Sequence, residues 1–494
     1  MKAAKKGIWG WTAVTLAVLA VFCTWRPELG RKGQALIVLA GGALTAVLLW
    51  IDREIRKKER KPERIFLMLF IPISLAMMIA LPLFRAPDEP AHLIRIWQIS
   101  IGQWIPNSRN EGVFYEPSNL IWGEAEKITL KQLAETAAEK MDMENLVVSS
   151  AGANTGFYPI NNYFPQALGM ALVRLVTKNR LAILYGARFG GWLATLLLLY
   201  YAVKKIPAGK NLLIAMALTP MFLQEAISAS ADGITCAATA AFLAMILQLR
   251  TQKERCEKKQ YLEIFLLTFC VCTFKMFYCP LALLLLSVPE ECFGGKKEKR
   301  KVLFWIAVII LGMIGAWMLI CLKNYIVPST SAGNGIIDQV KWILRHPLGY
   351  LAVLGRTIVN NFGRYANGVI GDSLSWFNIT IPSLLPMVQM FTVWTIAIHD
   401  RRLKETLRMR LNIMALSAVS VLAIFTSLYA WWNPYANEWI YGIQGRYFLP
   451  LLPGVVLAAL PNGAEDESIA ENGLVAMALT DVCVWVFVWI STVV

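Results

Sequence analysis

The chain has 494 residues, of which 57% are hydrophobic and only 16% are charged. Apolar runs of about 20 residues, the length that crosses a bilayer as a helix, recur along the chain, and this composition excludes an ordinary soluble protein. The formal net charge of +15 lies in short clusters between the apolar runs, a distribution typical of cytoplasmic loops rather than of nucleic-acid binding. The sequence therefore predicts an all-α, polytopic integral membrane protein.

The nine cysteines lie mostly within apolar runs. They form no CxxC pair and no His/Cys spacing of a metal site, so we predict neither a cysteine-bound metal nor a disulfide framework. The sequence also contains no P-loop and no GxGxxG fingerprint, which leaves nucleotide hydrolysis and dinucleotide binding without support.

The chain begins with a basic segment, residues 1–6, followed by an apolar run at 8–25. Because no small-residue cleavage site precedes Arg26 and a second span follows at 34–51, we expect a signal anchor with a cytoplasmic N-terminus rather than a cleaved signal peptide. Residues 52–64 carry seven Lys or Arg, which predicts a cytoplasmic loop.

A third predicted span at about 65–84 places the next segment, up to about residue 180, on the outer face, with helices of its own at 90–103 and 126–140. Within it, residues 163–176 are expected as a helix that lies on the bilayer or dips into it. The alternative is a true span, which would scatter the later basic clusters between the two faces. The remaining predicted spans, which bring the total to about 11–14 helices, are 181–203, 211–227, 232–249, a half-length pair at 261–274 and 276–289, 302–322, 379–398, 411–430, 446–461 and 472–494.

These assignments divide the chain into four parts. Residues 1–64 hold two helices and the basic loop, and residues 65–325 form a membrane core that includes the outer loop 85–180. Residues 326–378 form a second outer loop, whose mixed apolar pattern predicts interfacial helices, and residues 379–494 form the C-terminal helices.

Two acids stand directly behind the third predicted span, within residues 85–95 (RAPDEPAHLIR). A proline follows them, which suits the first turn of a helix, so His92 and Arg95 lie on one helix face with Asp88, and Asp88 or Glu89 caps the helix. One interpretation is a capped amphipathic helix on the bilayer surface. The other is a catalytic site, since a carboxylate in this place can take a proton from a hydroxyl group.

Four more charged residues stand at or near membrane depth, where polar groups are costly and are therefore functional candidates. Three of them also have a structural interpretation. Asp232 suits a helix N-cap, and Arg446 suits the edge of a span, from which an arginine side chain extends to the interface. Arg188 suits an ion pair with an acid of a neighbouring helix. Lys275 lies between the two half-length segments, which aims it at an anionic group. Cations near the same interface as the acids can hold a phosphate that leaves, which would suit a substrate that joins a phosphate to a lipid tail.

Five short motifs occur in order along residues 65–460: Pro87-Asp88-Glu89-Pro90-x-His92, Tyr158-Pro159-x-x-x-Tyr163-x-Pro165, Ser230-Ala-Asp232-Gly233, Lys275-x-x-Tyr278-x-Pro280 and Gln444-Gly445-Arg446-Tyr447-x-x-Pro450. In this order they resemble a bacterial family of predicted membrane proteins, the domain of unknown function 2142. That family in turn is similar to the GT-C superfamily of polytopic glycosyltransferases. The first two predicted spans and the last one lie outside the resemblance.

The resemblance implies an enzyme of the bacterial plasma membrane that moves a sugar from a polyprenyl-phosphate donor to a cell-envelope glycan, polymer or lipid on the outer face. In such enzymes an acid in the first outer loop is the catalytic base, a role that falls here on Asp88 or Glu89. Arg446, Lys275 and Arg188 are expected to bind the donor phosphate. The residues expected to support these groups or to bind substrate are His92, Arg95, Tyr158, Tyr163, Asp232, Gln444 and Tyr447. No metal ligand is predicted, although Mg²⁺ or Mn²⁺ shared by Asp232 and the first acids is compatible with the resemblance.

Two other functions fit the sequence. A transporter or flippase of lipid-linked saccharides would also be polytopic and basic at membrane depth, and it predicts interrupted helices at matching positions. A noncatalytic scaffold for envelope assembly predicts an outer surface without a cavity that opens to lipid.

Overall fold

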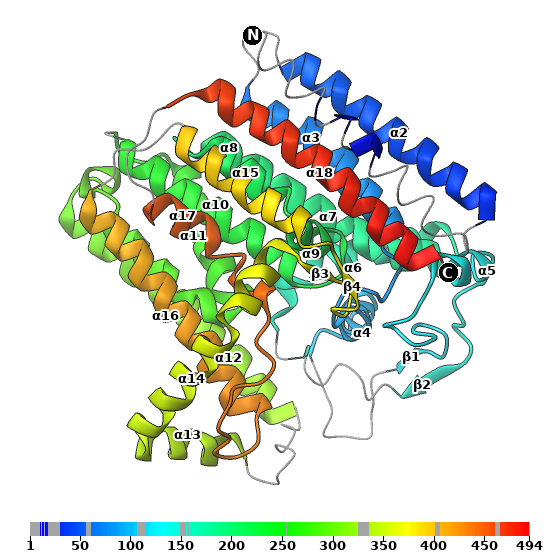
Figure 1. Ribbon diagram of the computed structural model, residues 1–494. Coiled ribbons are helices and arrows are strands. Elements are labelled where there is room, and N and C mark those ends of the chain that lie inside the picture. Colours follow the sequence, from blue (N-terminus) through cyan, green and yellow to red (C-terminus); the bar gives the residue numbers. More distant parts are fainter. Residues whose placement is uncertain are drawn as a thin grey trace.

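The computed structural model describes residues 10, 12–13, 15–17, 30–55, 61–105, 115–148, 155–156, 158–252, 254–324, 335–400, 406–459 and 465–493. Over these residues the protein is all-α, as Figure 1 shows. The described strands form two short antiparallel pairs, β1 (Tyr115–Pro117) with β2 (Leu146–Val148) and β3 (Ser373–Leu374) with β4 (Ile379–Thr380). Most of the first predicted span, 8–25, lies outside the described residues.

Seven of the described helices are long and apolar enough to cross a bilayer. The shortest has 19 residues, which corresponds to about 28 Å of helix. The polytopic membrane class predicted from the sequence is therefore confirmed. The seven helices are α2 (Gly30–Ile55), α3 (Pro62–Ala80), α7 (Arg180–Lys205), α10 (Asp232–Thr251), α12 (Lys296–Asn324), α16 (Leu407–Trp432) and α18 (Glu467–Val493).

Other predicted spans are built from shorter pieces. The run 211–227 consists of α8 (Lys210–Ala217) and α9 (Pro220–Ile227), because Pro220 has no N–H to continue the first helix and suits the start of the second. Apolar runs alone do not reveal such interruptions, so the long helices are fewer than the predicted spans. The remaining pieces are the half-length pair, α11 (Lys258–Phe274) and the 3-10 helix η3 (Met276–Ser287), then η4 (Glu290–Phe293), α15 (Leu384–His399), η5 (Gly445–Phe448) and α17 (Leu452–Ala459).

Helix α10 is the centre of the bundle, and 94% of its apolar stretch is buried. It packs against α7, α9 and α11, and its many alanines allow these neighbours to approach closely. Helix α18, which is also largely buried, lies beside α15, α3 and α2 (Figure 1). Because α10 begins at Asp232, the central helix holds this acid at a fixed place inside the protein.

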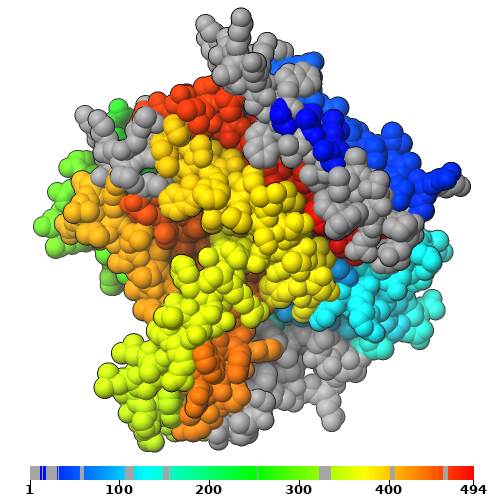
Figure 2. All heavy atoms as spheres, in the orientation of Figure 1, coloured from blue at the N-terminus to red at the C-terminus, as the bar shows by residue number. Residues whose placement is uncertain are grey.

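The segments predicted as outer loops contain helices of different lengths. Helix α4 (Glu89–Ser100) agrees with the predicted helix at 90–103, whereas α5 (Leu130–Glu135) is shorter than the predicted 126–140 and begins at a capping box formed by Thr129. The second segment contains α13 (Ile336–Arg345) and α14 (Pro347–Ile370). In Figure 2 these two helices, with the end of α16, form a lobe at the lower left.

Helix α6 (Phe164–Val176) and α7 form a close helical hairpin. The two backbones touch at Gly190, where an added Cβ would lie 2.2 Å from the carbonyl oxygen of Pro165. Through the neighbouring Gln166, whose Nε2–H donates to the Ser230 carbonyl oxygen at 3.1 Å, the hairpin also supports the segment that precedes α10. The α6–α7 contact therefore helps to position the end of the central helix.

We expect Gly190→Ala to separate α6 from α7, because backbone cannot yield to a Cβ at 2.2 Å. Overpacking of this kind costs about 1–3 kcal/mol of unfolding free energy. The measurement is thermal unfolding of the purified protein in detergent. The matched control is Gly363→Ala in α14, where an added Cβ meets nothing within 4 Å. Equal melting temperatures for the two variants would show that the hairpin contact has no structural importance.

Candidate functional site

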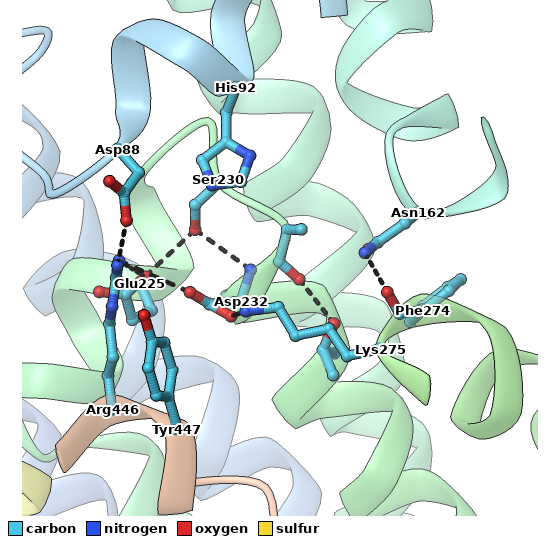
Figure 3. A network of polar contacts seen from close by, with 12 residues as sticks. Asp88, His92, Asn162, Glu225, Ser230, Asp232, Phe274, Lys275, Arg446 and Tyr447 are labelled. Atoms are coloured by element: carbon cyan, nitrogen blue, oxygen red, sulfur yellow. Dashed lines mark hydrogen bonds and ion pairs between the residues drawn. The ribbon is translucent and has the colours of Figure 1, made fainter. Parts of the chain in front are cut away.

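Charged side chains from distant parts of the chain meet in one cluster inside the protein (Figure 3). We use the name charge cluster for five of them: Asp88, Glu225, Asp232, Lys275 and Arg446. They come from the α3–α4 loop, α9, the start of α10, the junction of α11 with η3, and η5. Four of the five are functional candidates predicted from the sequence, and the structure brings these four together.

Asp88 is the accessible member of the charge cluster. It precedes α4 in a left-handed conformation, with φ 64° and ψ 0°, which Asp and Asn adopt more readily than most residues. Its side chain does not cap the helix. Instead Oδ2 accepts a hydrogen bond of 2.5 Å from Arg446 Nη2, while 47% of the Asp88 side chain remains exposed.

Arg446 is buried in η5 and faces three carboxylates. Besides Asp88, its Nη1 lies 3.5 Å from Asp232 Oδ2 and 3.7 Å from Glu225 Oε2. The same Nη1 donates to the Pro87 carbonyl oxygen at 3.2 Å. The preceding Gly445 is needed because η5 lies against the backbone of α14, where an added Cβ would be 2.4 Å from the carbonyl carbon of Gly368.

Lys275 is the second cation of the charge cluster, and it forms an ion pair with Asp232 Oδ1. It stands at the junction of α11 and η3, where the backbone is extended. Its ammonium lies 5.7 Å from the ring centre of Tyr158 and 5.3 Å from that of Tyr447, which suits cation–π contacts. The aromatic motif residues thus enclose the lysine. The sequence predicts an anionic partner for Lys275, and within the protein this partner is Asp232.

Glu225 is the member of the charge cluster that is not predicted from the sequence. It is 1% exposed in α9, and its Oε2 accepts from Ser230 Oγ at 3.1 Å. Gln224 Nε2 donates to Oε1 at 3.3 Å. Its position in the sequence nevertheless indicates a candidate, because an acid within an apolar run of membrane length is rare unless it is functional or paired.

Glu89 and Arg188 form a separate, fully buried ion pair. Arg188 Nε and Nη2 donate to the two oxygens of Glu89, each at 2.7 Å, and both side chains are 0% exposed. Two further N–H groups of Arg188, on Nη1 and Nη2, donate to the carbonyl oxygens of Leu81 and Pro82. The geometry therefore does not favour Glu89 as the base or Arg188 as a phosphate ligand, because each already satisfies the other. It agrees with the alternative that Arg188 pairs with an acid of a neighbouring helix.

His92 lies behind the charge cluster on α4. Its Nδ1 lies 2.7 Å from the hydroxyl oxygen of Tyr163. Burial lowers the pKa of His92 to about 4, and burial raises the pKa of Tyr163 well above its usual value. Both side chains are therefore neutral at pH 7, and their contact positions α4 rather than supplying charge.

Two other predicted residues lie apart from the charged groups. Arg95 turns toward the end of α4, where Nη2 donates to the Trp104 carbonyl oxygen at 2.7 Å. Gln444 precedes η5 and lines a polar cavity of about 440 Å³. Arg95 is thus placed to hold the end of α4, and Gln444 is placed at the wall of the cavity.

The polar cavity adjoins an apolar groove. Asn360, Arg364 and Gln444 are among the residues that line the cavity. The groove, of about 370 Å³, lies between α14, α16, η5 and α17. Tyr365 lines both spaces, and Phe448 of η5 lines the groove. An amphiphile whose head lies in the cavity and whose tail lies in the groove would run alongside the helix that carries Arg446.

The turn between β3 and β4 packs on the loop that carries Asp88. Trp376 Nε1–H donates to the Phe84 carbonyl oxygen at 2.9 Å, and Arg85 Nη2 donates to Asn378 Oδ1 at 3.3 Å. The Ser375 N–H donates to Gln224 Oε1 at 2.6 Å, which links the turn to α9. The turn therefore closes one side of the site.

Among the described residues, no group of three or more His, Cys, Asp or Glu side chains is arranged to hold a metal ion. The acids of the charge cluster are instead matched by two cations and by the Ser230 hydroxyl. The chemistry that this arrangement offers is proton acceptance at Asp88 and charge stabilisation at Arg446 and Lys275.

The fold and the charge cluster together define a polytopic helical membrane protein with a polar site enclosed between its helices. The chain belongs to the predicted membrane protein family DUF2142, whose family model matches residues 69–455. All five residues of the charge cluster fall within the matched region. No curated protein and no solved structure matches the chain.

We expect Glu89→Gln to destabilise the protein by about 3–5 kcal/mol, because it leaves the buried Arg188 without its counter-charge. Thermal unfolding in detergent measures the effect. The matched control is Glu124→Gln, which breaks an ion pair with Lys127 whose side chains are 73% and 76% exposed. That change should leave the melting temperature close to the wild-type value, because an exposed ion pair contributes little to stability. A Glu89→Gln variant as stable as the control would contradict the structural role of the pair.

The pH dependence of stability follows from His92. Its pKa is lower in the folded protein than in the unfolded chain, so the unfolded chain binds more protons between about pH 6.5 and 4. The contribution of His92 to stability is therefore complete above about pH 6.5 and is lost as the pH falls toward 4. We expect the melting temperature to fall over this interval.

The variant His92→Asn should flatten this part of the pH profile, because its amide can contact Tyr163 without titrating. The exposed His346 serves as the control, and His346→Asn should keep the wild-type profile. An unchanged slope in His92→Asn would show that other groups cause the acid loss of stability.

Proposed function

We propose that the chain is a membrane glycosyltransferase, which takes a sugar from a polyprenyl-phosphate donor and passes it to a glycan, polymer or lipid of the bacterial cell envelope on the outer face of the plasma membrane. One observation carries the proposal: in a membrane protein, a half-exposed carboxylate, Asp88, lies directly against the buried Arg446, and Asp232 joins Arg446 to a second buried cation, Lys275. The motif order resembles the DUF2142 family, and the similarity of that family to GT-C enzymes supports the same function.

The proposed reaction uses Asp88 as the base. The acceptor hydroxyl gives its proton to the Asp88 carboxylate, and its oxygen forms a bond to the anomeric carbon of the sugar. The bond between that carbon and the phosphate oxygen breaks, and its electron pair leaves with the polyprenyl phosphate. Arg446 and Lys275 stabilise the charge that develops on the leaving phosphate. Attack from the side opposite the phosphate inverts the anomeric centre.

The other residues of the site hold these groups in place. Glu89 positions the Asp88 loop through Arg188, and Asp232 holds Lys275. Tyr158 and Tyr447 cover the lysine, and their rings also suit contact with a sugar. This assignment differs from the sequence-based expectation in two respects: Glu89 positions the base and is not itself the base, and Arg188 holds Glu89 and is not a phosphate ligand.

The cavities support a ligand of the proposed class. The apolar groove is bordered by helix faces and suits an isoprenoid tail, and the adjoining polar cavity suits a phosphate or sugar head. They favour a ligand-binding protein over a scaffold whose outer surface lacks such spaces.

A second candidate function is transport of a lipid-linked saccharide. Two helix interruptions favour it, one between α8 and α9 and one at Lys275 between α11 and η3. It gives no role to an accessible carboxylate beside a buried arginine. Release of polyprenyl phosphate by the purified protein would separate the two functions, because transport leaves the donor intact.

We expect Asp88→Asn to reduce sugar transfer by about 10²- to 10⁴-fold, because the amide cannot accept the hydroxyl proton. The assay incubates purified protein in lipid nanodiscs with polyprenyl-phosphate sugars and an acceptor, and follows release of polyprenyl phosphate. Asn tolerates the left-handed backbone at this position, so the variant should fold. The control Asp338→Asn, an exposed acid on α13, should retain wild-type activity. Full activity in Asp88→Asn would rule out this residue as the base.

A further inference from the structure

We infer that Arg446 is a phosphate-binding site whose resting occupant is the Asp88 carboxylate, and that a phosphate ligand binds by displacing this carboxylate. The inference rests on the proposed function for its ligand, polyprenyl phosphate, and it adds an order of events: the base becomes free only when the donor is bound.

Both cations of the charge cluster are already paired. Lys275 is 5% exposed and holds Asp232, and Arg446 is 3% exposed and holds Asp88. A phosphate therefore cannot reach either cation without competing with a carboxylate. The question is which carboxylate can leave.

Asp88 is the carboxylate that can leave. Its side chain is 47% exposed, whereas the Asp232 side chain is 7% exposed and that of Glu225 is 0% exposed. Glu225 is also held by Ser230, and Asp232 by Lys275. Among the described residues, Arg446 is the only hydrogen-bond partner of the Asp88 side chain. Displacement of Asp88 therefore breaks one hydrogen bond and increases the exposure to water of a carboxylate that is already half exposed.

Arg446 has the capacity to bind the incoming group. Its Nε is buried and has no hydrogen-bond partner among the described residues. Once Asp88 leaves, Nη2 is also free, and Nε with Nη2 forms the two-pronged edge of a guanidinium that binds phosphate oxygens. Nη1 keeps its bond to the Pro87 carbonyl oxygen, so the guanidinium stays oriented during the exchange.

The exchange links donor binding to proton transfer. While Asp88 is bound to Arg446, the arginine competes with an acceptor hydroxyl for the carboxylate oxygen. After the exchange, the same carboxylate lies beside a bound phosphate with both oxygens able to accept a proton. The acceptor is then activated only in the presence of the donor, which predicts ordered binding with the donor first.

The test measures binding and needs no turnover. Purified full-length protein in nanodiscs is titrated with polyprenyl phosphate, and the matched control ligand is the uncharged polyprenol of the same chain length. We expect Asp88→Asn to bind polyprenyl phosphate on the order of tenfold more tightly than wild type, because the competing charged hydrogen bond is gone. Binding of polyprenol should not change, and Asp338→Asn should bind both ligands as wild type does.

A double variant separates displacement from a general reduction of negative charge. Arg446→Lys keeps a cation opposite the buried acids but removes the two-pronged edge. In this background, Asp88→Asn should no longer tighten binding, whereas a general charge effect would persist. Persistence of the tightening, or no tightening in Asp88→Asn alone, overturns the inference.

Inorganic phosphate in the same titration identifies what the site recognises. If inorganic phosphate competes with polyprenyl phosphate and binds Asp88→Asn more tightly than wild type, Arg446 recognises the phosphate alone. If only polyprenyl phosphate binds Asp88→Asn more tightly, recognition requires the lipid tail as well as the phosphate headgroup. The two proposals fail separately: tighter binding without any sugar transfer would leave the displacement intact and refute the enzyme, and transfer without tighter binding would do the reverse.

Discussion

The architecture around the site depends on one buried ion pair, Glu89 with Arg188. Two charges with no access to water are tolerated only when each fully compensates the other. Arg188 compensates Glu89 with two hydrogen bonds, and the N–H groups of Phe84 and Ala229 supply two more at 2.8 and 2.9 Å. This pair joins α7 to the start of α4 and to the segment that precedes α10. The places of both Asp88 and Asp232 follow from it.

The charge cluster is stabilised by the same compensation of opposite charges, with one difference. Its members are also compensated, but four of the five lie where helices start, stop or change form, and Glu225 lies near the end of the short α9. Asp232 begins α10, Lys275 separates α11 from η3, and Arg446 belongs to the short η5. Helix ends leave backbone groups unpaired and give side chains a common point of convergence. The interrupted helices and the polar site are therefore two aspects of one arrangement.

The sequence predicts a large part of this structure. Hydropathy yields the membrane class and most helix positions, because the period and length of apolar runs depend only on local residues. The rule that charges at membrane depth are functional or paired selects Asp88, Asp232, Lys275 and Arg446. It applies equally to Glu225, which lies in a run otherwise assigned as an ordinary span.

Pairing between distant residues is what the sequence does not reveal. Arg188 lies 99 positions from Glu89, and Arg446 lies 358 positions from Asp88. Adjacent acids such as Asp88 and Glu89 look equivalent in the sequence, yet one points to the half-exposed site and the other into the core. The difference arises from the backbone turn between them, which depends on the surrounding fold.

The backbone around Asp88 shows a second feature of the site, unusual dihedral angles, which does not involve charge. Among the described residues, five non-glycine residues have positive φ, and four of them lie in the two loops that touch each other here: Phe84, Asp88, Ser375 and Phe377. Such conformations cost on the order of 1–3 kcal/mol each and persist only where neighbours leave no alternative. The hydrogen bonds of Trp376 and Ser375 to Phe84 and Gln224 supply that constraint. The two loops thus keep each other strained, and a change that relaxes one of them would release conformational energy in the other.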